Sequence, residues 1–217
     1  MLNGKGLSIL GDSISTYRGV SNNKEANHTT EYNPYFYSEP FPLEGTYWMR
    51  LLREFDMTLC VNNSWSGGNL SGIDNPDSGV NRAHHLIDNN GNAPDYIIVF
   101  MGINDLGRNV AEDEFARDYG RTLSVIKEKY PSAAVCCVNI PDRYPELKPR
   151  CELFNQAISD AVRAAGESFF VADLFGSRLN NDFYYMNTVD GLHPDEDGAR
   201  IIFEVVRDAF GEYISRL

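Results

Sequence analysis

Three short segments contain side chains that together could perform acyl transfer through a covalent serine intermediate. Ser13 follows the apolar run Leu7–Leu10, and Asn104 follows another apolar run. Asp190 and His193 lie three residues apart near the carboxyl end of the chain. A serine hydroxyl becomes a nucleophile when an imidazole accepts its proton, and a carboxylate can orient that imidazole. An amide side chain can stabilise the negative charge that develops on the attacked carbonyl oxygen.

The sequence around these residues resembles the SGNH hydrolases, the GDSL-type esterase and lipase superfamily, over nearly the whole chain. The resemblance depends on four blocks in the expected order: Gly11-Asp12-Ser13, Asn62–Gly67, Gly102-Ile103-Asn104-Asp105 and Asp190-Gly191-Leu192-His193. It implies that Ser13 is the nucleophile, His193 the base and Asp190 the orienting acid. It also implies an oxyanion hole formed by the backbone N–H groups of Ser13 and Gly67 and the side chain of Asn104. The motif Gly-x-Ser-x-Gly is absent from the sequence, which disfavours an ordinary α/β-hydrolase.

Each assignment has a structural alternative. Ser13 could be the N-cap of a helix, a common role for a serine that follows a strand. Asp190 could be a turn residue only, in which case a backbone carbonyl would orient the imidazole. Asn104 could also be a turn residue, and Gly67 only a flexible one. Two acidic residues beside the predicted site are interpreted as structural hydrogen-bonding groups: Asp12 and Asp105.

Apolar runs of strand length alternate along the chain with stretches of helical period. The predicted strands are Leu7–Leu10, Thr58–Val61, Tyr96–Met101, Ala134–Ile140 and Ser168–Leu174. The predicted helices are Thr46–Phe55, Val80–Asn89, Glu112–Tyr130, Leu147–Ala165 and Glu196–Leu217. This alternation predicts a three-layer α/β/α sandwich with a flavodoxin-like parallel sheet of five strands, the fold that the resemblance also implies. Ligands bind outside the carboxyl ends of the strands in such sheets, where Ser13, Gly67 and Asn104 are expected.

The composition indicates one globular domain that spans residues 1–217. The chain has 42% hydrophobic and 23% charged residues. Its net charge of −12 would repel a phosphate backbone and an anionic membrane surface, so we expect neither nucleic acid nor a membrane as a partner. Four cysteines without Cys-x-x-Cys spacing predict buried free thiols, and we expect neither a metal site nor a cofactor. The sequence gives no indication of an oligomeric state.

The start of the chain shows no basic region, long apolar stretch or cleavage site for a signal peptide. The sequence as given therefore predicts a cytoplasmic protein. A signal peptide removed from a precursor would leave the same sequence.

An aromatic insertion, Tyr17–Glu44, separates Ser13 from the first predicted helix. It is far longer than the roughly 2 to 6 residues of a typical connection. Its many tyrosine, phenylalanine and proline residues predict an ordered segment that covers the pocket, with Tyr35, Phe36 and Tyr37 contacting the substrate. The alternative is that these aromatic residues only pack the loop onto the body of the protein.

Together these features predict a serine esterase that hydrolyses a small acyl ester through a Ser-acyl intermediate. The expected substrate is a small acylated compound, a carbohydrate that carries an O-acetyl group. The resemblance suggests this substrate, and aromatic residues can stack on sugar rings. An acyltransferase would use the same residues. A noncatalytic domain that binds a carbohydrate or a protein could share the scaffold, although its catalytic residues would then be vestigial.

Overall fold

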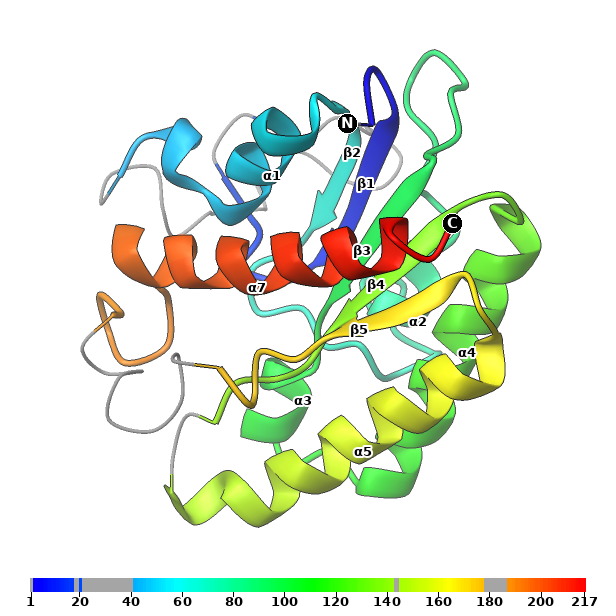
Figure 1. Ribbon diagram of the computed structural model, residues 1–217. Coiled ribbons are helices and arrows are strands. Elements are labelled where there is room, and N and C mark those ends of the chain that lie inside the picture. The colour runs from blue at the N-terminus through cyan, green and yellow to red at the C-terminus, as the bar shows by residue number, and fades with distance from the viewer. Residues whose placement is uncertain (1, 18–19, 21–40, 143–144, 178–186) are drawn as a thin grey trace.

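Five apolar segments pair as the strands of one parallel sheet (Figure 1). They are β1 (Gly6–Gly11), β2 (Thr58–Ser64), β3 (Tyr96–Phe100), β4 (Ala134–Val138) and β5 (Phe169–Ala172). The strand order is β2-β1-β3-β4-β5, and every neighbouring pair is parallel. The structure is a computed structural model that describes residues 2–17, 20, 41–142, 145–177 and 187–217.

Helices cover both faces of this sheet. They are α1 (Tyr47–Phe55), α2 (Gly79–Arg82), α3 (Ile103–Gly107), α4 (Glu112–Lys129), α5 (Lys148–Ala165) and α7 (Glu196–Ile214), with 3₁₀ turns at Leu43–Gly45 and Pro145–Leu147. Helices α1 and α7 pack together on one face, and α4 packs with α5 and α2 on the other (Figure 1). The predicted three-layer α/β/α sandwich is therefore confirmed, and its strand order is that of flavodoxin-like sheets.

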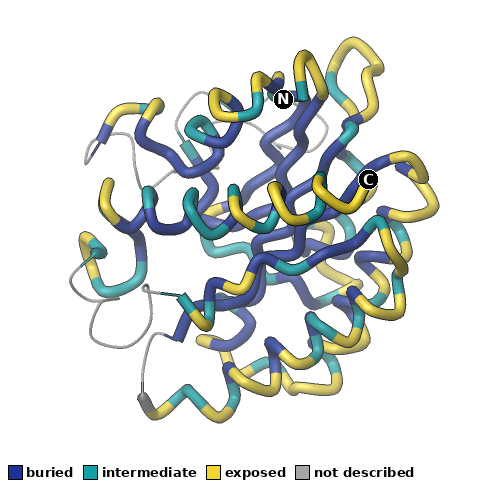
Figure 2. The backbone as a smooth tube through the Cα atoms, in the orientation of Figure 1, coloured by how far each residue is buried: buried dark blue, intermediate teal, exposed yellow. Residues whose placement is uncertain are grey.

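The core lies on both sides of the strands, which are mostly dark blue in Figure 2. Strand β3 is buried along its whole length, as expected for a strand with helices on both faces. The inner positions of α4 are spaced three and four residues apart, at Phe115, Tyr119, Leu123 and Ile126, and each is at most 1% exposed. The Phe115 ring stacks on Phe154 of α5 with a centroid distance of 4.1 Å. This layer packs against Gly102 after β3, where a Cβ would lie 3.1 Å from the Phe115 ring.

The helix predicted over Val80–Asn89 is wrong, because only α2 is helical there and the chain continues in turns. The carbonyl groups of Arg82 and His85, which a longer helix would use internally, accept hydrogen bonds from Asn63 Nδ2 at 3.1 Å each. A side chain at the end of β2 therefore replaces the helical hydrogen bonds. This tertiary interaction cannot be read from the hydrophobic period of the segment.

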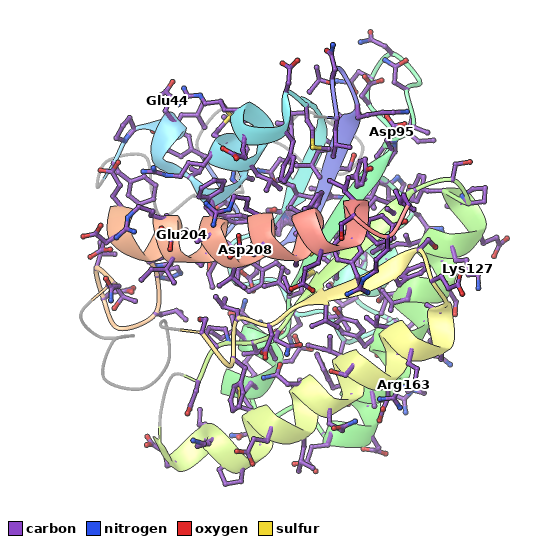
Figure 3. All side chains as sticks on the ribbon, in the orientation of Figure 1. Glu44, Asp95, Lys127, Arg163, Glu204 and Asp208 are labelled. Carbon is purple, nitrogen blue, oxygen red and sulfur yellow. The ribbon has the colours of Figure 1, made fainter. Side chains whose placement is uncertain are left out.

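The charged side chains labelled in Figure 3 lie on the outside of the helices and loops: Glu44, Asp95, Lys127, Arg163, Glu204 and Asp208. No helix in the described part of the chain is both long enough and apolar enough to cross a membrane. All four cysteines are buried and form no disulfide bond, as predicted. Burial raises the pKa of the Cys137 thiol to about 12, so this group is not a reactive thiolate near neutral pH.

Candidate active site

Ser13 lies in a tight turn immediately after β1 and is 3% exposed. Asp12 Oδ1 accepts the Ile14 N–H at 3.0 Å, and the Asp12 carbonyl accepts the Ser15 N–H at 3.0 Å. The Thr16 hydroxyl donates to the Ser13 carbonyl at 2.9 Å. None of the described residues in 13–20 is helical, so the N-cap alternative for Ser13 does not apply. The turn instead fixes the backbone on both sides of the serine.

A small loop before α7 presents His193. Thr188 and Pro194 pair across this loop as an antiparallel bridge, and the Val189 N–H donates to the His193 carbonyl at 2.9 Å. Gly191 at the tip has φ +79°, a conformation that glycine adopts without strain. The loop is therefore closed by its own backbone, and the residues at its tip are held close together.

The Ser13, His193 and Asp190 side chains form a continuous chain of hydrogen bonds. Ser13 Oγ is 2.9 Å from His193 Nε2, and His193 Nδ1 is 2.8 Å from Asp190 Oδ2. An ionised carboxylate only accepts hydrogen bonds, so Nδ1 must donate, and Nε2 of the neutral ring is left to accept the serine proton. The structure thus brings the three predicted residues together in the order that nucleophilic catalysis requires.

Asp190 is a turn residue and a partner of the imidazole at the same time. Its Oδ1 accepts the N–H groups of Leu192 at 3.0 Å and His193 at 2.8 Å, while Oδ2 faces the ring. Burial by itself would raise the pKa of Asp190, but the hydrogen bonds from His193 and Leu192 outweigh it and hold the pKa below its ordinary value. The carboxylate is therefore ionised at neutral pH. Asp190 thus lies in the turn and also contacts the ring, so it is not a turn residue only.

Two of the three predicted oxyanion donors follow the strands on either side of β1. In the sheet Gly11 pairs with Ser64 of β2 and with Phe100 of β3, so the chain segments that contain Gly67 and Asn104 leave the sheet on either side of the Ser13 turn. Asn104 Nδ2 donates one hydrogen bond, to the Gly68 carbonyl at 3.0 Å. This contact connects the two segments.

Each predicted donor retains a free hydrogen. The backbone N–H groups of Ser13 and Gly67 have no acceptor among the described residues, and one of the two Asn104 Nδ2 hydrogens is unused there. Ser13 is buried, and because buried backbone N–H groups are almost always paired, its free N–H indicates a donor that is available to a ligand oxygen.

Asp105 has the structural role expected of it. It is fully buried, and its carboxylate accepts the Leu70 N–H at 2.7 Å and the Ser71 N–H at 2.8 Å. Burial raises its pKa, and these hydrogen bonds oppose the shift. The residue beside Asn104 thus fastens α3 to the segment that follows Gly67.

A buried cation beneath the site has no counterpart in the predictions. Arg82 is 3% exposed and donates through Nη2 to the Gly11 carbonyl at 3.1 Å and through Nη1 to the Asn63 carbonyl at 2.6 Å. Burial lowers its pKa to about 10 and raises the pKa of nearby Asp12 to about 7. Arg82 therefore holds the ends of β1 and β2 together directly below the Ser13 turn.

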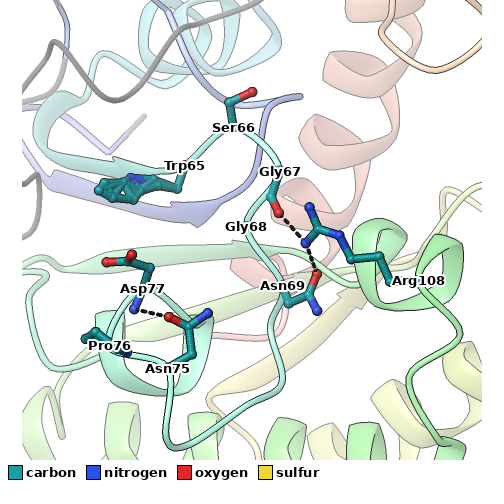
Figure 4. A pocket seen from close by; sticks show the side chains of 9 residues that line it. All are labelled: Trp65, Ser66, Gly67, Gly68, Asn69, Asn75, Pro76, Asp77 and Arg108. Carbon is teal, nitrogen blue, oxygen red and sulfur yellow. Dashed lines mark hydrogen bonds between the residues drawn. The ribbon is translucent and has the colours of Figure 1, made fainter.

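A cavity of about 540 Å³ adjoins the Gly67 segment (Figure 4). Its lining is mostly polar and comprises Trp65, Ser66, Gly67, Gly68, Asn69, Asn75, Pro76, Asp77 and Arg108. Arg108 is exposed and lies across the cavity from Asp77 (Figure 4). The sequence analysis did not identify Arg108, although its spacing of four residues from Asn104 would bring both to one side of a helix.

Most of the aromatic insertion, including Tyr35, Phe36 and Tyr37, lies outside the described residues. Its two ends are described. The Tyr17 hydroxyl donates to the Phe41 carbonyl at 3.4 Å, and Phe41 packs against Ala199 of α7. The insertion therefore begins and ends beside the helix that follows His193. Among the described residues no three His, Cys, Asp or Glu side chains are grouped so that they could hold a metal ion.

Comparison with solved structures finds proteins of the same fold. A Bacteroides uniformis protein described as a GDSL-like lipase matches at 22% identity over 96% of both chains, with a TM-score of 0.71. A Bacteroides ovatus protein with the same description matches at 20% identity over 99% of this chain and 100% of that one, also with a TM-score of 0.71. A family two carbohydrate esterase from Clostridium thermocellum in complex with cellohexaose matches at 15% identity over 98% of this chain and 65% of that chain, with a TM-score of 0.69.

No curated protein matches the chain significantly by sequence. The model of one protein family, however, matches residues 9–201, a range that includes the Ser13 turn and the His193 loop. The chain therefore belongs to the GDSL-like Lipase/Acylhydrolase family and is a hydrolase of ester bonds.

Proposed function

We propose that this hydrolase is a serine esterase that removes a small acyl group, with an O-acetyl group on a carbohydrate as the expected substrate. The observation that supports this most strongly is the chain of hydrogen bonds from Ser13 Oγ to His193 Nε2, 2.9 Å, and from His193 Nδ1 to Asp190 Oδ2, 2.8 Å. A nucleophile and a base within hydrogen-bond distance meet the geometric requirement for covalent catalysis.

In the proposed acylation, Ser13 Oγ bonds to the ester carbonyl carbon while His193 Nε2 accepts the serine proton. The tetrahedral intermediate then breaks its bond to the alcohol oxygen, and His193 returns the proton to that oxygen. In deacylation, water gives a proton to His193 and attacks the acyl carbon, and the released Ser13 oxygen takes the proton back. Ionised Asp190 stabilises the imidazolium that forms in both halves of the reaction.

The negative charge of each tetrahedral intermediate lies on the former carbonyl oxygen. The free N–H groups of Ser13 and Gly67 and the unused Asn104 Nδ2 hydrogen support an oxyanion hole at this position. Donors that are already oriented lower the barrier because no solvent has to reorganise when the charge develops.

The preference for a hydroxylated substrate is supported by the cavity of about 540 Å³ beside Gly67, whose polar lining offers amide, carboxylate and guanidinium groups. Such groups form hydrogen bonds with hydroxyl groups and are poor neighbours for a long aliphatic chain. The structural similarity to a carbohydrate esterase in complex with cellohexaose agrees with this preference. The contact of Tyr35, Phe36 and Tyr37 with the substrate stays a prediction.

The test combines covalent labelling with a substrate series. A fluorophosphonate should add one label to the parent and none to Ser13→Ala, whereas Ser124→Ala, which removes an exposed serine on α4, should be labelled like the parent. The parent should hydrolyse acetylated sugars and p-nitrophenyl acetate faster than p-nitrophenyl palmitate. A parent that is neither labelled nor active would be a binding domain, and labelling of Ser13→Ala would place the nucleophile elsewhere. Faster hydrolysis of the palmitate would contradict the small acyl group.

A further inference from the structure

The segment Trp65–Gly68 forms a turn whose type determines where the Gly67 N–H points. The Gly68 N–H donates to the Trp65 carbonyl at 3.0 Å, and Gly67, the third residue, has φ +73°. A positive φ at this position defines a type II turn and favours glycine. Type I and type II turns differ by a flip of the central peptide group, which here contains the Gly67 N–H. The Gly67 N–H can serve as an oxyanion donor only if this peptide group keeps one orientation.

One side chain outside the turn contacts it directly. Arg108 Nη1 donates to the Gly67 carbonyl at 2.6 Å and to Asn69 Oδ1 at 2.5 Å (Figure 4). Its Nη2 lies 3.3 Å from the position that a Cβ on Gly67 would occupy. The guanidinium therefore holds the carbonyl of the turn glycine and, through Asn69, the residue after the turn. Hydrogen bonds from a charged donor are stronger than those between neutral groups.

Arg108 comes from the same helix as the predicted side-chain donor. Its own N–H donates to the Asn104 carbonyl at 2.9 Å, so the two residues are one helical turn apart at the end of α3. Asn104 Nδ2 binds the Gly68 carbonyl at 3.0 Å. Helix α3 and the residue that caps it thus bind two successive carbonyl groups of the turn, and the predicted donors Gly67 and Asn104 belong to one hydrogen-bonded unit.

Arg108 is exposed, and within the described residues no carboxylate lies within ion-pair distance of its guanidinium. The hydrogen bonds of its side chain in the structure go to the Gly67 segment. The guanidinium thus binds a backbone carbonyl and is not part of a surface ion pair. This partner indicates that Arg108 affects the conformation of the turn.

We propose that Arg108 is a positioning residue that holds Gly67 in its positive-φ conformation and thereby keeps the Gly67 N–H directed at the oxyanion. This inference rests on the proposed esterase function, because that function gives the N–H its purpose. Arg108 acts through Gly67 without touching the reacting atoms. Its loss should therefore weaken binding of the transition state and leave binding of a small ester without hydroxyl groups nearly unchanged.

The kinetic test uses Arg108→Ala and Arg108→Lys, with Arg163→Ala as a control that removes an exposed arginine paired with Asp160 on α5. With p-nitrophenyl acetate we expect Arg108→Ala to lower kcat by about 10- to 100-fold, less than the roughly 10²- to 10³-fold that loss of an oxyanion donor produces. KM should stay within threefold of the parent. Arg108→Lys, which keeps one charged donor, should recover part of the rate, and the control should behave like the parent.

Two further measurements separate positioning from substrate contact. A phenylboronic acid, which forms a tetrahedral anion on a catalytic serine, should bind Arg108→Ala more weakly by the same factor as the loss in kcat. The double variant of Gly67→Ala with Arg108→Ala should be no slower than the slower single variant, because both changes disturb the same turn. A raised KM with unchanged kcat, or independent effects in the double variant, would overturn the proposal.

Nuclear magnetic resonance tests the conformation without any turnover. In the parent the Gly67 amide should give one resonance, with coupling constants that correspond to φ near +73°. In Arg108→Ala the Gly67 coupling constants should change, because they become an average over the observed turn and the turn with the flipped peptide group. Unchanged Gly67 couplings in Arg108→Ala would refute the positioning role. An inactive, unlabelled parent would instead refute the proposed function, and the Gly67 couplings would still decide whether Arg108 fixes the turn.

Discussion

Replacing Asp190 by asparagine separates the two functions of its carboxylate. Oδ1 accepts the backbone N–H groups of Leu192 and His193, and Oδ2 faces His193 Nδ1. Asparagine has one oxygen and one NH₂ group, so it can satisfy only one side of this arrangement. If its oxygen keeps the two backbone bonds, the NH₂ group faces Nδ1 and forces the ring proton onto Nε2. The imidazole then cannot accept the Ser13 proton.

The structure gives the size of this effect. The opposite orientation of the amide would leave two backbone N–H groups without an acceptor, at about 1–3 kcal/mol each. The total of about 2–6 kcal/mol favours the inactive orientation by roughly 30-fold to 10⁴-fold. Because the Asp190 side chain is 34% exposed, water offsets part of this penalty and the lower part of the range applies. We therefore expect Asp190→Asn to lower kcat/KM by about 30- to 10³-fold at neutral pH.

Asp190→Ala is the matched comparison. Alanine leaves space for a water molecule that can accept a hydrogen bond from the Nδ1–H group. The active tautomer therefore stays accessible, and the loss in kcat/KM should be smaller than for asparagine. The assay is hydrolysis of p-nitrophenyl acetate by both variants, together with ¹⁵N spectra of His193 that report which ring nitrogen is protonated. If Asp190→Asn retained more activity than Asp190→Ala, or kept its proton on Nδ1, the tautomer argument would be refuted.

Three further predictions follow from the same contacts. Asn104→Ala should lower kcat by about 10²- to 10³-fold and change KM less, and a kcat within threefold of the parent would leave Asn104 with only its bond to Gly68. Because the pKa of Asp190 is below its ordinary value, this carboxylate stays ionised between pH 5 and 8, so a rate that rises with pH in this range should reflect loss of the His193 proton, whereas a flat profile would contradict His193 as the base. The pKa of Asp12, about 7 when folded, exceeds the roughly 3.9 of an unfolded aspartate, so the folded chain binds the extra proton and loses stability as pH rises between these values. Urea unfolding at pH 5 and pH 8 should show this loss, about 3 kcal/mol, in the parent and not in Asp12→Asn, and equal losses in both would contradict it.

The strands were predictable because burial on both faces requires continuous apolar runs. Strand β3 was predicted as Tyr96–Met101 and is observed as Tyr96–Phe100. The false helix over Val80–Asn89 and the unpredicted α3 show the limit of this signal. In the first, the Asn63 side chain takes carbonyl groups that a helix needs, and in the second, five residues are too few to display a hydrophobic period.

Some residues of the site could be predicted from the sequence, and others could not. Ser13, Asp190 and His193 lie at the places where a doubly wound sheet presents side chains, so motif and topology point to the same residues. Arg82 and Arg108 bind backbone carbonyl groups of segments distant in the sequence. A carbonyl group is present at every residue, and no residue type marks it as an acceptor, so the sequence does not reveal these two contacts. The spacing of four residues from Asn104 indicates only that Arg108 lies near the site.

The contacts beneath Ser13 explain why the two residues before it are Gly11 and Asp12. A Cβ on Gly11 would lie 2.6 Å from Ser64 Oγ and 2.7 Å from Ser15 Cβ, so any larger residue would push β1 and β2 apart. Asp12 Oδ1 caps the turn through the Ile14 N–H, and Oδ2 has no partner among the described residues although it is buried. An unpaired buried oxygen is costly, and the Arg82 guanidinium nearby offsets only part of that cost, since the pKa of Asp12 still rises to about 7. The chain therefore gives up stability at this position to keep a rigid turn under Ser13, which is what a nucleophile that must stay 2.9 Å from its base requires.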